Sequence, residues 1–402
     1  MNDRASSSSF SPLSVTFTLF TVVLACLTAL PTFADVAKYN ILDLGTLGGS
    51  DNSALGINSS GRVVGFAQVP GGYHPFRTAA NSPISPGTDD LGTSGGTESY
   101  AYGISDLNQV VGYSSTVGIA NSHAFRTASN GKVTASSDLG TLGGPSSIGY
   151  AINASGQAVG GSQLTANGNY HAFRTGPNGL ITASSDLGSL TGDAYAQGIN
   201  ASGQVVGVAS TAQNASSHAF RTTANGIIDA TSDLGTLGGL HAIAYGINDS
   251  GQAVGSSFLA GNTVQHAFRT TPNGLITPAS DLDTPDSVNS RAYGINASGQ
   301  TVGYKETTSG VMHAFFADVT GPMVDLNDLI PAGSGWTLVE ARSINTSGQI
   351  VGRGILGGEN HPFLLTPVDS VPEPSLVTVV VGCAGWVCLR GRKVRDRRRL
   401  LR

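Results

Sequence analysis

The chain of 402 residues contains very little cysteine: Cys26, Cys383 and Cys388 all lie near its two ends. The central part therefore has no disulfide bond, thiolate metal site or cysteine nucleophile. Charged residues are also scarce, at 12% of the chain. Between Asp35 and Val371 there are 12 Lys and Arg against 23 Asp and Glu, which gives a net charge of −11. An acidic domain of this kind argues against a nucleic-acid partner.

Sequence motifs of common active sites are missing as well. The chain has no His-Glu-x-x-His pair and no phosphate loop, and its Gly-Gly pairs never precede a helical pattern. Gly92-Thr93-Ser94-Gly95-Gly96 matches the letters Gly-x-Ser-x-Gly, but it too precedes no helical pattern, so it is not a nucleophile elbow. We therefore expect no catalytic residues, no cofactor and no metal ion.

What the chain does contain is a repeat. The stretch Gly56–Gly65, with Ile57-Asn58 at its start, is followed nine residues later by His74-Pro75-Phe76-Arg77. The His-x-Phe element recurs at spacings of 47 to 49 residues, at His74, His123, His171, His218, His266, His313 and His361. A fixed period of this length indicates a modular architecture, in which no single unit buries its own apolar face.

Each repeat reads as two β-hairpins. In one copy, Gly198-Ile199-Asn200 leads through Ser202-Gly203 into Gln204–Gly207, a tight reversal between two short strands. Next, His171–Thr175 of the preceding copy alternates in polarity, Asn178-Gly179 is a strong turn signal, and Leu180–Thr182 is predicted to resume as a strand. Four short antiparallel strands in about 48 residues are the size of a propeller blade.

The two ends of the repeat region predict ring closure. Tyr39–Leu44 reads as a fourth strand without the first three, whereas the last copy stops after its third strand, His361–Thr366. Pairing these ends removes two free sheet edges. The sequence thus predicts an all-β, seven-bladed β-propeller of four-stranded repeats in a domain spanning 35–370. A β-solenoid with two coils per repeat is the alternative.

The repeated polar residues have structural interpretations. Seven equivalent histidines on a ring lie too far apart to bind one metal ion, so we expect them to form hydrogen bonds within or between blades. An aspartate of the Asp-Leu-Gly-Thr type precedes each Ile-Asn element, and we expect it to cap a turn, since one carboxylate per repeat is insufficient for calcium. His241 lies outside the pattern and is expected in a solvated loop.

Two inter-blade segments depart from the consensus and form the candidate ligand patch. Asp281–Asp286 contains three aspartates, and the last segment combines Asp325-Leu326-Asn327-Asp328 with an insertion that contains Trp336. The ligand patch thus comprises Asp283, Asp286, Asp325, Asp328 and Trp336. An exposed Trp beside acidic residues stacks on sugars; the preferred alternative is that Trp336 closes the seam between the first and last blades.

The N-terminus has the features of a secretory signal peptide. Arg4 precedes an apolar segment, Leu13–Leu30, and small residues at Thr32 and Ala34 fit cleavage after Ala34 by signal peptidase. Residues 1–34 are therefore excluded from the predicted fold. A lipoprotein signal at Cys26 is disfavoured, because Leu24 stands where a small residue is preferred.

The C-terminal 371–402 has a different composition from the repeats. Val371-Pro372-Glu373-Pro374 breaks regular structure, Ser375–Leu389 is almost wholly apolar, and eight Lys and Arg follow. This order predicts a membrane helix with a basic cytoplasmic stop, although 15 residues are short for a span of about 20. A buried core helix is the alternative.

These residues carry two family resemblances. The C-terminal segment resembles the PEP-CTERM sorting signal of bacteria, because it combines Val371, Pro372, Glu373 and Pro374 with the apolar run and the arginine cluster. That resemblance implies export, transient retention in the inner membrane, processing by an exosortase, and delivery to the cell surface or extracellular matrix. The repeats resemble the HAF family of extracellular repeats, named for the His-Ala-Phe found at His123, His171, His218, His266 and His313. The HAF resemblance implies no particular activity.

Together, these features predict an exported, exosortase-sorted, non-enzymatic repeat protein of the surface or matrix, with exopolysaccharide as its candidate ligand. The alternative function is a propeller-type carbohydrate-active hydrolase or lyase. It requires two carboxylates in one cleft, and Asp283, Asp286, Asp325 and Asp328 are the clustered candidates.

Overall fold

The computed structural model describes residues 38–116, 121–165, 168–211, 215–283 and 288–368. The predicted signal-peptidase site at Ala34 and the predicted sorting motif Val371–Pro374 lie outside these residues, as does the predicted membrane segment. Among the described residues, no helix has the length and apolarity needed to span a membrane.

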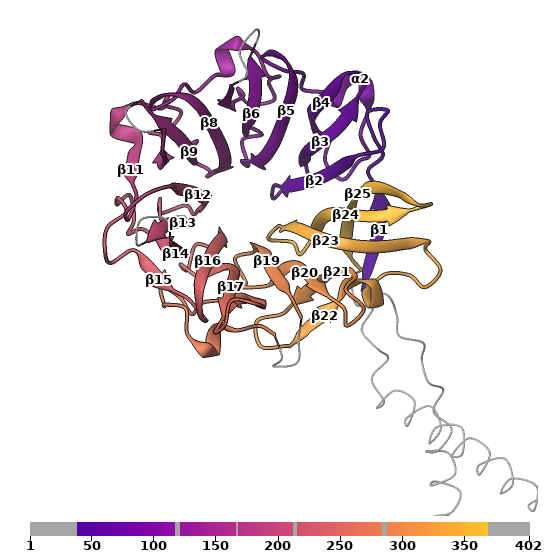
Figure 1. The fold of residues 1–402 in the computed structure, drawn as a ribbon. Coiled ribbons are helices and arrows are strands. Elements are labelled where there is room, and N and C mark those ends of the chain that lie inside the picture. The colour runs from indigo at the N-terminus through magenta and orange to yellow at the C-terminus, as the bar shows by residue number, and fades with distance from the viewer. Residues whose placement is uncertain (1–37, 117–120, 166–167, 212–214, 284–287, 369–402) are drawn as a thin grey trace, which may run out of the picture. The chain divides into compact units, whose positions relative to one another are not determined.

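The fold is all-β with a propeller-like arrangement, in which short antiparallel sheets surround a centre (Figure 1). Each sequence repeat forms one antiparallel unit, which we number 1 to 7 in chain order from Asn52. The strands nearest the centre are the first of each unit: β2 (Asn52–Ile57), β5 (Gly95–Ile104), β8 (Gly143–Ile152), β12 (Ala194–Ile199), β16 (Gly238–Ile247), β19 (Ser290–Ile295) and β23 (Trp336–Ile344).

Two further strands complete the shared part of every unit. The second strands are β3 (Val63–Val69), β6 (Val110–Thr116), β9 (Ala158–Leu164), β13 (Val205–Thr211), β17 (Ala253–Leu259), β20 (Thr301–Glu306) and β24 (Ile350–Leu356). The third strands carry the His-x-Phe element: β4 (Gly72–Arg77), β7 (Ser122–Arg126), β10 (Tyr170–Arg174), β14 (Ser216–Arg221), β18 (Gln265–Arg269), β21 (Met312–Ala317) and β25 (Glu359–Pro367).

The prediction of four strands in every repeat needs correction, because only four of the described units are four-stranded. Their fourth strands are β11 (Asp186–Gly188), β15 (Asp233–Gly235), β22 (Met323–Asp325) and β1 (Tyr39–Asp43). In the other three units, the equivalent aspartate makes a single bridge to the buried phenylalanine, as in Phe76–Asp90. The same turn from the aspartate to the glycine occurs in units with and without a fourth strand, so it does not distinguish them.

The predicted pairing of the two ends is confirmed. Strand β1 pairs antiparallel with β25 over five residue pairs, from Tyr39–Pro367 to Asp43–Phe363. The repeat of unit 7 ends after its third strand, and β1 from the other end of the chain supplies its fourth strand. This pairing covers the free edge of β25. This closed arrangement differs from the two-coil solenoid that the sequence left open.

Short helices of three or four residues lie between the third strand of one unit and the first strand of the next. They are α2 (Pro86–Asp89), η1 (Ala135–Ser137), η2 (Ala183–Ser185), η3 (Pro278–Ser280) and η4 (Leu326–Leu329). The strand predicted at Leu180–Thr182 does not form, and η2 begins at the next residue. Asn178 does adopt a positive φ of 54° in that turn, but Ile181 then donates its N–H to Leu139 O of the preceding unit at 2.8 Å. This segment therefore packs between units instead of pairing with its own hairpin.

The core is built from the same positions in every unit, and the Phe of His-x-Phe is its predicted anchor. All seven are at most 1% exposed: Phe76, Phe125, Phe173, Phe220, Phe268, Phe315 and Phe363. In one unit, Phe220 packs with Val205, Ala196 and Leu187. Glycine in the second strand allows this packing, because a Cβ at Gly207 would collide with the carbonyl oxygen of Tyr195. The role predicted for these phenylalanines is confirmed.

Candidate functional site

The Ile-Asn element of every repeat lines one cavity at the centre of the ring. The cavity has a volume of about 270 Å³, and each of the seven units contributes the end of its first strand and the residue that follows. We call this cavity the axial funnel. Its lining consists of an apolar ring, Ile57, Ile104, Ile152, Ile199, Ile247, Ile295 and Ile344, with asparagines, one serine and small or acidic residues above it.

Asparagine side chains hold this ring together. In unit 4, Asn200 Oδ1 accepts the N–H of Gln204 at 2.9 Å, which fixes the local turn. Asn200 Nδ2 donates to the carbonyl oxygen of Asn248 in the next unit at 3.1 Å. The same inter-unit bond recurs around the ring, and Asn345 Nδ2 donates to Asn58 O at 3.1 Å across 287 positions of sequence. The asparagines are only 3–6% exposed, so each bond links neighbouring units in a dry environment.

The mouth of the axial funnel departs from sevenfold symmetry at two acidic residues. The residue after the Asn-equivalent position is Asp106 in unit 2 and Asp249 in unit 5, where three other units have alanine. Asp106 Oδ1 accepts from both N and Oγ of Ser59, at 2.9 and 2.7 Å. Asp249 Oδ1 accepts from Ala201 N at 2.9 Å. These carboxylates add charged hydrogen-bond acceptors to a cavity whose other polar lining residues are neutral Asn, Ser and Thr.

A β-bulge in every first strand presents a second ring of side chains below the funnel. The register between first and second strands shifts around one residue, two positions before the isoleucine, in all seven units. A bulge leaves its extra residue unpaired and redirects its side chain. We call these residues the bulge ring: Leu55, Tyr102, Tyr150, Gln197, Tyr245, Tyr293 and Arg342.

Contacts within the bulge ring join different units. The rings of Tyr102 and Tyr150 lie 5.3 Å apart, and those of Tyr245 and Tyr293 lie 5.1 Å apart. The guanidinium of Arg342 lies 4.2 Å from the centroid of Tyr293. Arg342 of unit 7 also interacts electrostatically with Tyr102 of unit 2, so these side chains converge on the axis. Burial raises the pKa of Tyr102, Tyr150 and Tyr293 to about 12, so their hydroxyl groups stay protonated at neutral pH.

A buried carboxylate supports the cationic side of this ring. Glu340 lies two residues before Arg342 and is 4% exposed. It forms ion pairs with Arg342 at 2.9 Å and with Arg353 at 3.2 Å. Burial opposes the charge of Arg342, but Glu340 and the neighbouring tyrosines outweigh it and raise the pKa of this guanidinium. Arg342 is therefore held in place and charged, with 31% of its side chain exposed.

The repeated His and Asp residues form one dyad per unit, as the structural interpretation predicted. The His Nδ1 to Asp carboxylate distances are 2.6–3.1 Å in all seven pairs. The aspartate also caps a turn, since Asp186 Oδ1 accepts from Gly188 N at 2.7 Å. His241 corrects our expectation of a loop residue: it lies in β16 and bonds Ser217 Oγ through Nδ1 at 3.0 Å.

The arginine after each anchor phenylalanine is also part of the scaffold in most units. Arg174 Nη1 donates to the carbonyl oxygens of Gly203 and Gly226 in the next unit, at 3.1 and 3.0 Å. Burial lowers the pKa of Arg174, yet the two carbonyl groups satisfy its donors. The recurrent cations thus fasten one unit to the next.

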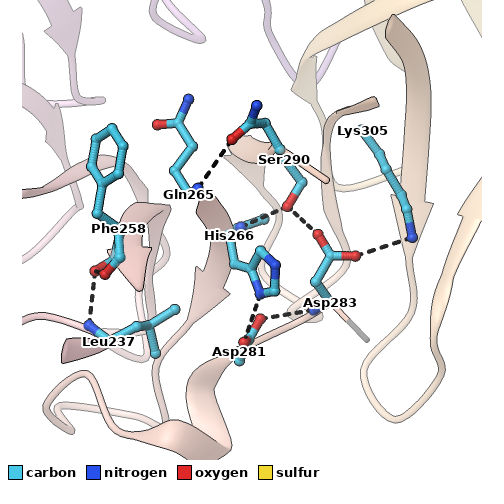
Figure 2. Close-up of polar contacts among 11 residues, drawn as sticks. Leu237, Phe258, Gln265, His266, Asp281, Asp283, Ser290 and Lys305 are labelled. Atoms are coloured by element: carbon cyan, nitrogen blue, oxygen red, sulfur yellow. Dashed lines mark hydrogen bonds and ion pairs between the residues drawn. The ribbon is translucent and has the colours of Figure 1, made fainter. Parts of the chain in front are cut away.

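The structure separates the members of the predicted ligand patch. Asp283 has a fully buried carboxylate, which ion-pairs with Lys305 at 3.0 Å and accepts a hydrogen bond from Ser290 (Figure 2). Asp325 belongs to the dyad of His313, whereas Asp328 is exposed on η4. Trp336 packs edge-on against Phe363 at 6.2 Å, in a cluster of residues from units 6 and 7 that contains Tyr39 of β1. That cluster includes no residue of unit 1, so it does not place Trp336 at a seam between the first and last units. Asp286 lies outside the described residues.

Asp283 and its ion-pair partner Lys305 both depart from the repeat consensus. Lys305 stands where five other units have Ala or Ser and one has Gly, and Asp283 stands where five other copies have glycine. A second cavity of about 220 Å³ lies beside Lys305, and its lining includes Glu306, His313 and Asp325. Among the described residues, no group of three or more His, Cys, Asp and Glu is arranged to hold a metal ion.

Comparisons with known proteins leave the family open. A family model described as "Protein of unknown function (DUF3466)" matches residues 194–364, which is less than half of the chain. No curated protein matches. Among solved structures, an X-ray structure of a provisionally assigned gluconolactonase is 9% identical, covers 84% of this chain and 96% of its own, and has a TM-score of 0.36. A triple arginine-to-alanine mutant of AofleA from Arthrobotrys oligospora is 10% identical, covers 74% and 91%, and has a TM-score of 0.38.

Proposed function

We propose that this protein is an exported, non-enzymatic seven-bladed β-propeller of the cell surface or extracellular matrix, which binds exopolysaccharide at its axial site. We define the axial site as the axial funnel together with the bulge ring. The observation that carries the proposal is the convergence of equivalent residues from all seven units on one cavity. Concave sites lined by apolar and aromatic side chains, with a few placed polar groups, are typical of ligand binding.

The seven-blade interpretation rests on equivalence between units. Each unit contributes the same Ile position to the funnel, the same bulge to its first strand and the same dyad to its third. The hydrogen bond from Asn345 to Asn58 joins unit 7 to unit 1 in the way that Asn200 joins unit 4 to unit 5. The shorter fourth strands of three units make those blades three-stranded with a single added bridge.

The non-enzymatic interpretation follows from how the repeated charged groups are used. Each His Nδ1 is bonded to its Asp, and that Asp caps a turn, so the dyads serve the same structural purpose seven times. Catalysis by acid and base requires two groups poised at one reacting centre, whereas sevenfold repetition distributes identical groups around the ring.

Binding is tested by cosedimentation of the mature protein with purified exopolysaccharide from its host. Asp106→Ala and Asp249→Ala change the funnel mouth to the residue that units 3, 4 and 6 have at this position, so folding is preserved. We expect the double variant to bind at least several-fold more weakly. The control is Glu359→Ala, which removes an exposed carboxylate at the start of β25. Equal binding by all three proteins would exclude the funnel mouth as the binding site.

Export and sorting are tested separately, by intact-mass analysis of protein recovered from the outer fraction of an exosortase-positive host. The proposal expects both ends to be removed, one after Ala34 and the other near Pro372-Glu373-Pro374. A protein that keeps its C-terminal 32 residues in that fraction would refute exosortase processing.

The second cavity supports one alternative function, a carbohydrate-active hydrolase or lyase. Glu306 and Asp325 both line it, so two carboxylates share one site beside Lys305. Asp283 is not available for this chemistry, because its carboxylate is fully buried in an ion pair. The test is release of new reducing ends or unsaturated sugars from exopolysaccharide, comparing wild type with Glu306→Gln. Release that Glu306→Gln abolishes would establish the enzyme and overturn the non-enzymatic proposal.

A further inference from the structure

The bulge ring is the place where the fold leaves side-chain identity free. Its flanking residues barely change, since the preceding Ala and the following Gly-Ile recur in most units. At the bulge itself, leucine, tyrosine, glutamine and arginine all occur in the same backbone conformation. Since the backbone accepts different side chains at this position, the side chain is free to serve in ligand recognition. Bulges next to binding sites commonly point such a side chain toward the ligand.

The residues present are those that bind sugars. Tyrosine offers a rigid apolar face for the C–H groups of a pyranose ring and a hydroxyl for its oxygens. Gln197 adds an amide, which already interacts with the hydroxyl of Tyr150 by a hydrogen bond. The first strands advance about 3.3 Å per residue, so the bulge ring lies about 6 Å below the isoleucines of the funnel. The bulge-ring residues are half-buried and do not line the funnel itself, so a sugar that contacts both would have to extend past the isoleucine ring.

The charge around Arg342 is opposite to that of the whole domain. Arg291, Arg342 and Arg353 are grouped with two carboxylates, Glu340 and Glu306, which gives this part of the axis a local charge of +1 (3 − 2) within a domain of −11. The Nε of Arg342 is buried and has no hydrogen-bond partner among the described residues. Its Nη2 bonds Glu340 at 3.0 Å, and the planar group lies on Tyr293. A guanidinium fixed in this way is suited to pair with a carboxylate.

We infer that the bulge ring selects a carboxylated sugar, in which the carboxylate pairs with Arg342 and the pyranose ring stacks on Tyr293 or Tyr245. The inference rests on the proposed function, because it specifies which exopolysaccharide the axial site accepts. A neutral glycan would lack the ion pair with Arg342. The acidic surface of the domain would repel a long polyanion, except for the single sugar that enters the axis.

The test is calorimetric titration with a short oligomer of galacturonic acid and with the matching oligomer of galactose. Arg342→Gln places at this bulge the residue that unit 4 has naturally, so the backbone can accommodate it. We expect it to weaken binding of the acidic oligomer by about tenfold or more relative to its effect on the neutral oligomer. Arg342→Lys should recover part of the loss, because the charge returns without the planar fork.

The matched control is Lys132→Gln, which removes the same charge at an exposed position away from the axis. It should bind both oligomers like the wild type, and thermal unfolding of each variant verifies that it is folded. Equal affinity of the wild type for the two oligomers, or unchanged acidic-oligomer binding by Arg342→Gln, would overturn the inference while leaving glycan binding in place. Absence of binding to both oligomers and to the exopolysaccharide would overturn the proposed function as well.

Discussion

Replacing Tyr39 with alanine tests how much the closing strand stabilises the ring. Tyr39 is 6% exposed, packs in a cluster with residues of units 6 and 7, and contacts the Phe316 ring edge-on at 6.4 Å. Truncating a buried aromatic side chain costs about 3–5 kcal/mol. We take about 3 kcal/mol as the expected loss, because Tyr39 lies on a terminal strand that relaxes more readily than the interior. At about 2 °C per kcal/mol for a domain of this size, the unfolding midpoint should fall by about 6 °C.

The control and assay isolate the packing contribution. Asn40 is the next residue of β1 and is exposed, so Asn40→Ala should change the free energy of unfolding by less than about 0.5 kcal/mol. Tyr39→Phe retains the aromatic ring and should remain close to the wild type. Thermal unfolding is followed by far-ultraviolet circular dichroism, with limited proteolysis at the N-terminus as a second readout. If Tyr39→Ala is no less stable than Asn40→Ala, β1 does not close the ring and the paired ends are dispensable.

Three further predictions concern the remaining scaffold. Folding raises the pKa of Tyr102, Tyr150 and Tyr293 from 10 to about 12. The stability from these shifts is therefore complete below pH 10 and declines as the pH passes through 12, by about 2 kcal/mol per tyrosine. Absorbance titration at 295 nm measures these pKa values, and a common midpoint near pH 10 would contradict the prediction. Asn200→Ala removes one buried inter-unit hydrogen bond and three partly buried ones, and should cost about 2 kcal/mol in urea unfolding. Ser202→Ala, which removes only its own bond to Asn200 Oδ1, should cost clearly less. Asp186→Asn weakens a partly exposed ion pair and should cost about 1 kcal/mol or less; a loss above 3 kcal/mol would assign the dyad a larger role.

Repetition made the scaffold predictable from the sequence. The Phe position could be assigned to the core because it recurs seven times beside small apolar residues, and the structure buries every copy. The pairing of Tyr39–Asp43 with the last repeat followed from counting strands at the two ends. The fourth strands were less predictable, because a segment of three residues forms either a short strand or a single bridge with the same Asp-Leu-Gly sequence.

The axial site was harder to predict, because a β-bulge depends on the register between two strands. The sequence shows Ala-x-Gly-Ile-Asn with a variable x, but alternation alone does not reveal that x is unpaired. The variability of that one position among constant neighbours was the available signal. Asp283 was assigned to a ligand patch because aspartates cluster in the sequence there. Its partner Lys305 lies 22 residues away, and only the folded strands bring the two together.

Symmetry itself explains where a specific site can arise in this molecule. A consensus residue occurs once in every unit, so it surrounds the axis evenly and presents the same group in seven directions. Such a ring cannot recognise one particular sugar, which has a carboxylate on one side and an apolar face on another. Departures from the consensus supply the missing asymmetry: Asp106 and Asp249 at the funnel mouth, and Gln197 and Arg342 in the bulge ring. Glu340 and Arg353 also depart from the consensus beside Arg342, and Glu340 forms an ion pair with each arginine. Neighbouring side chains therefore hold Arg342 in position, and it is not an isolated substitution.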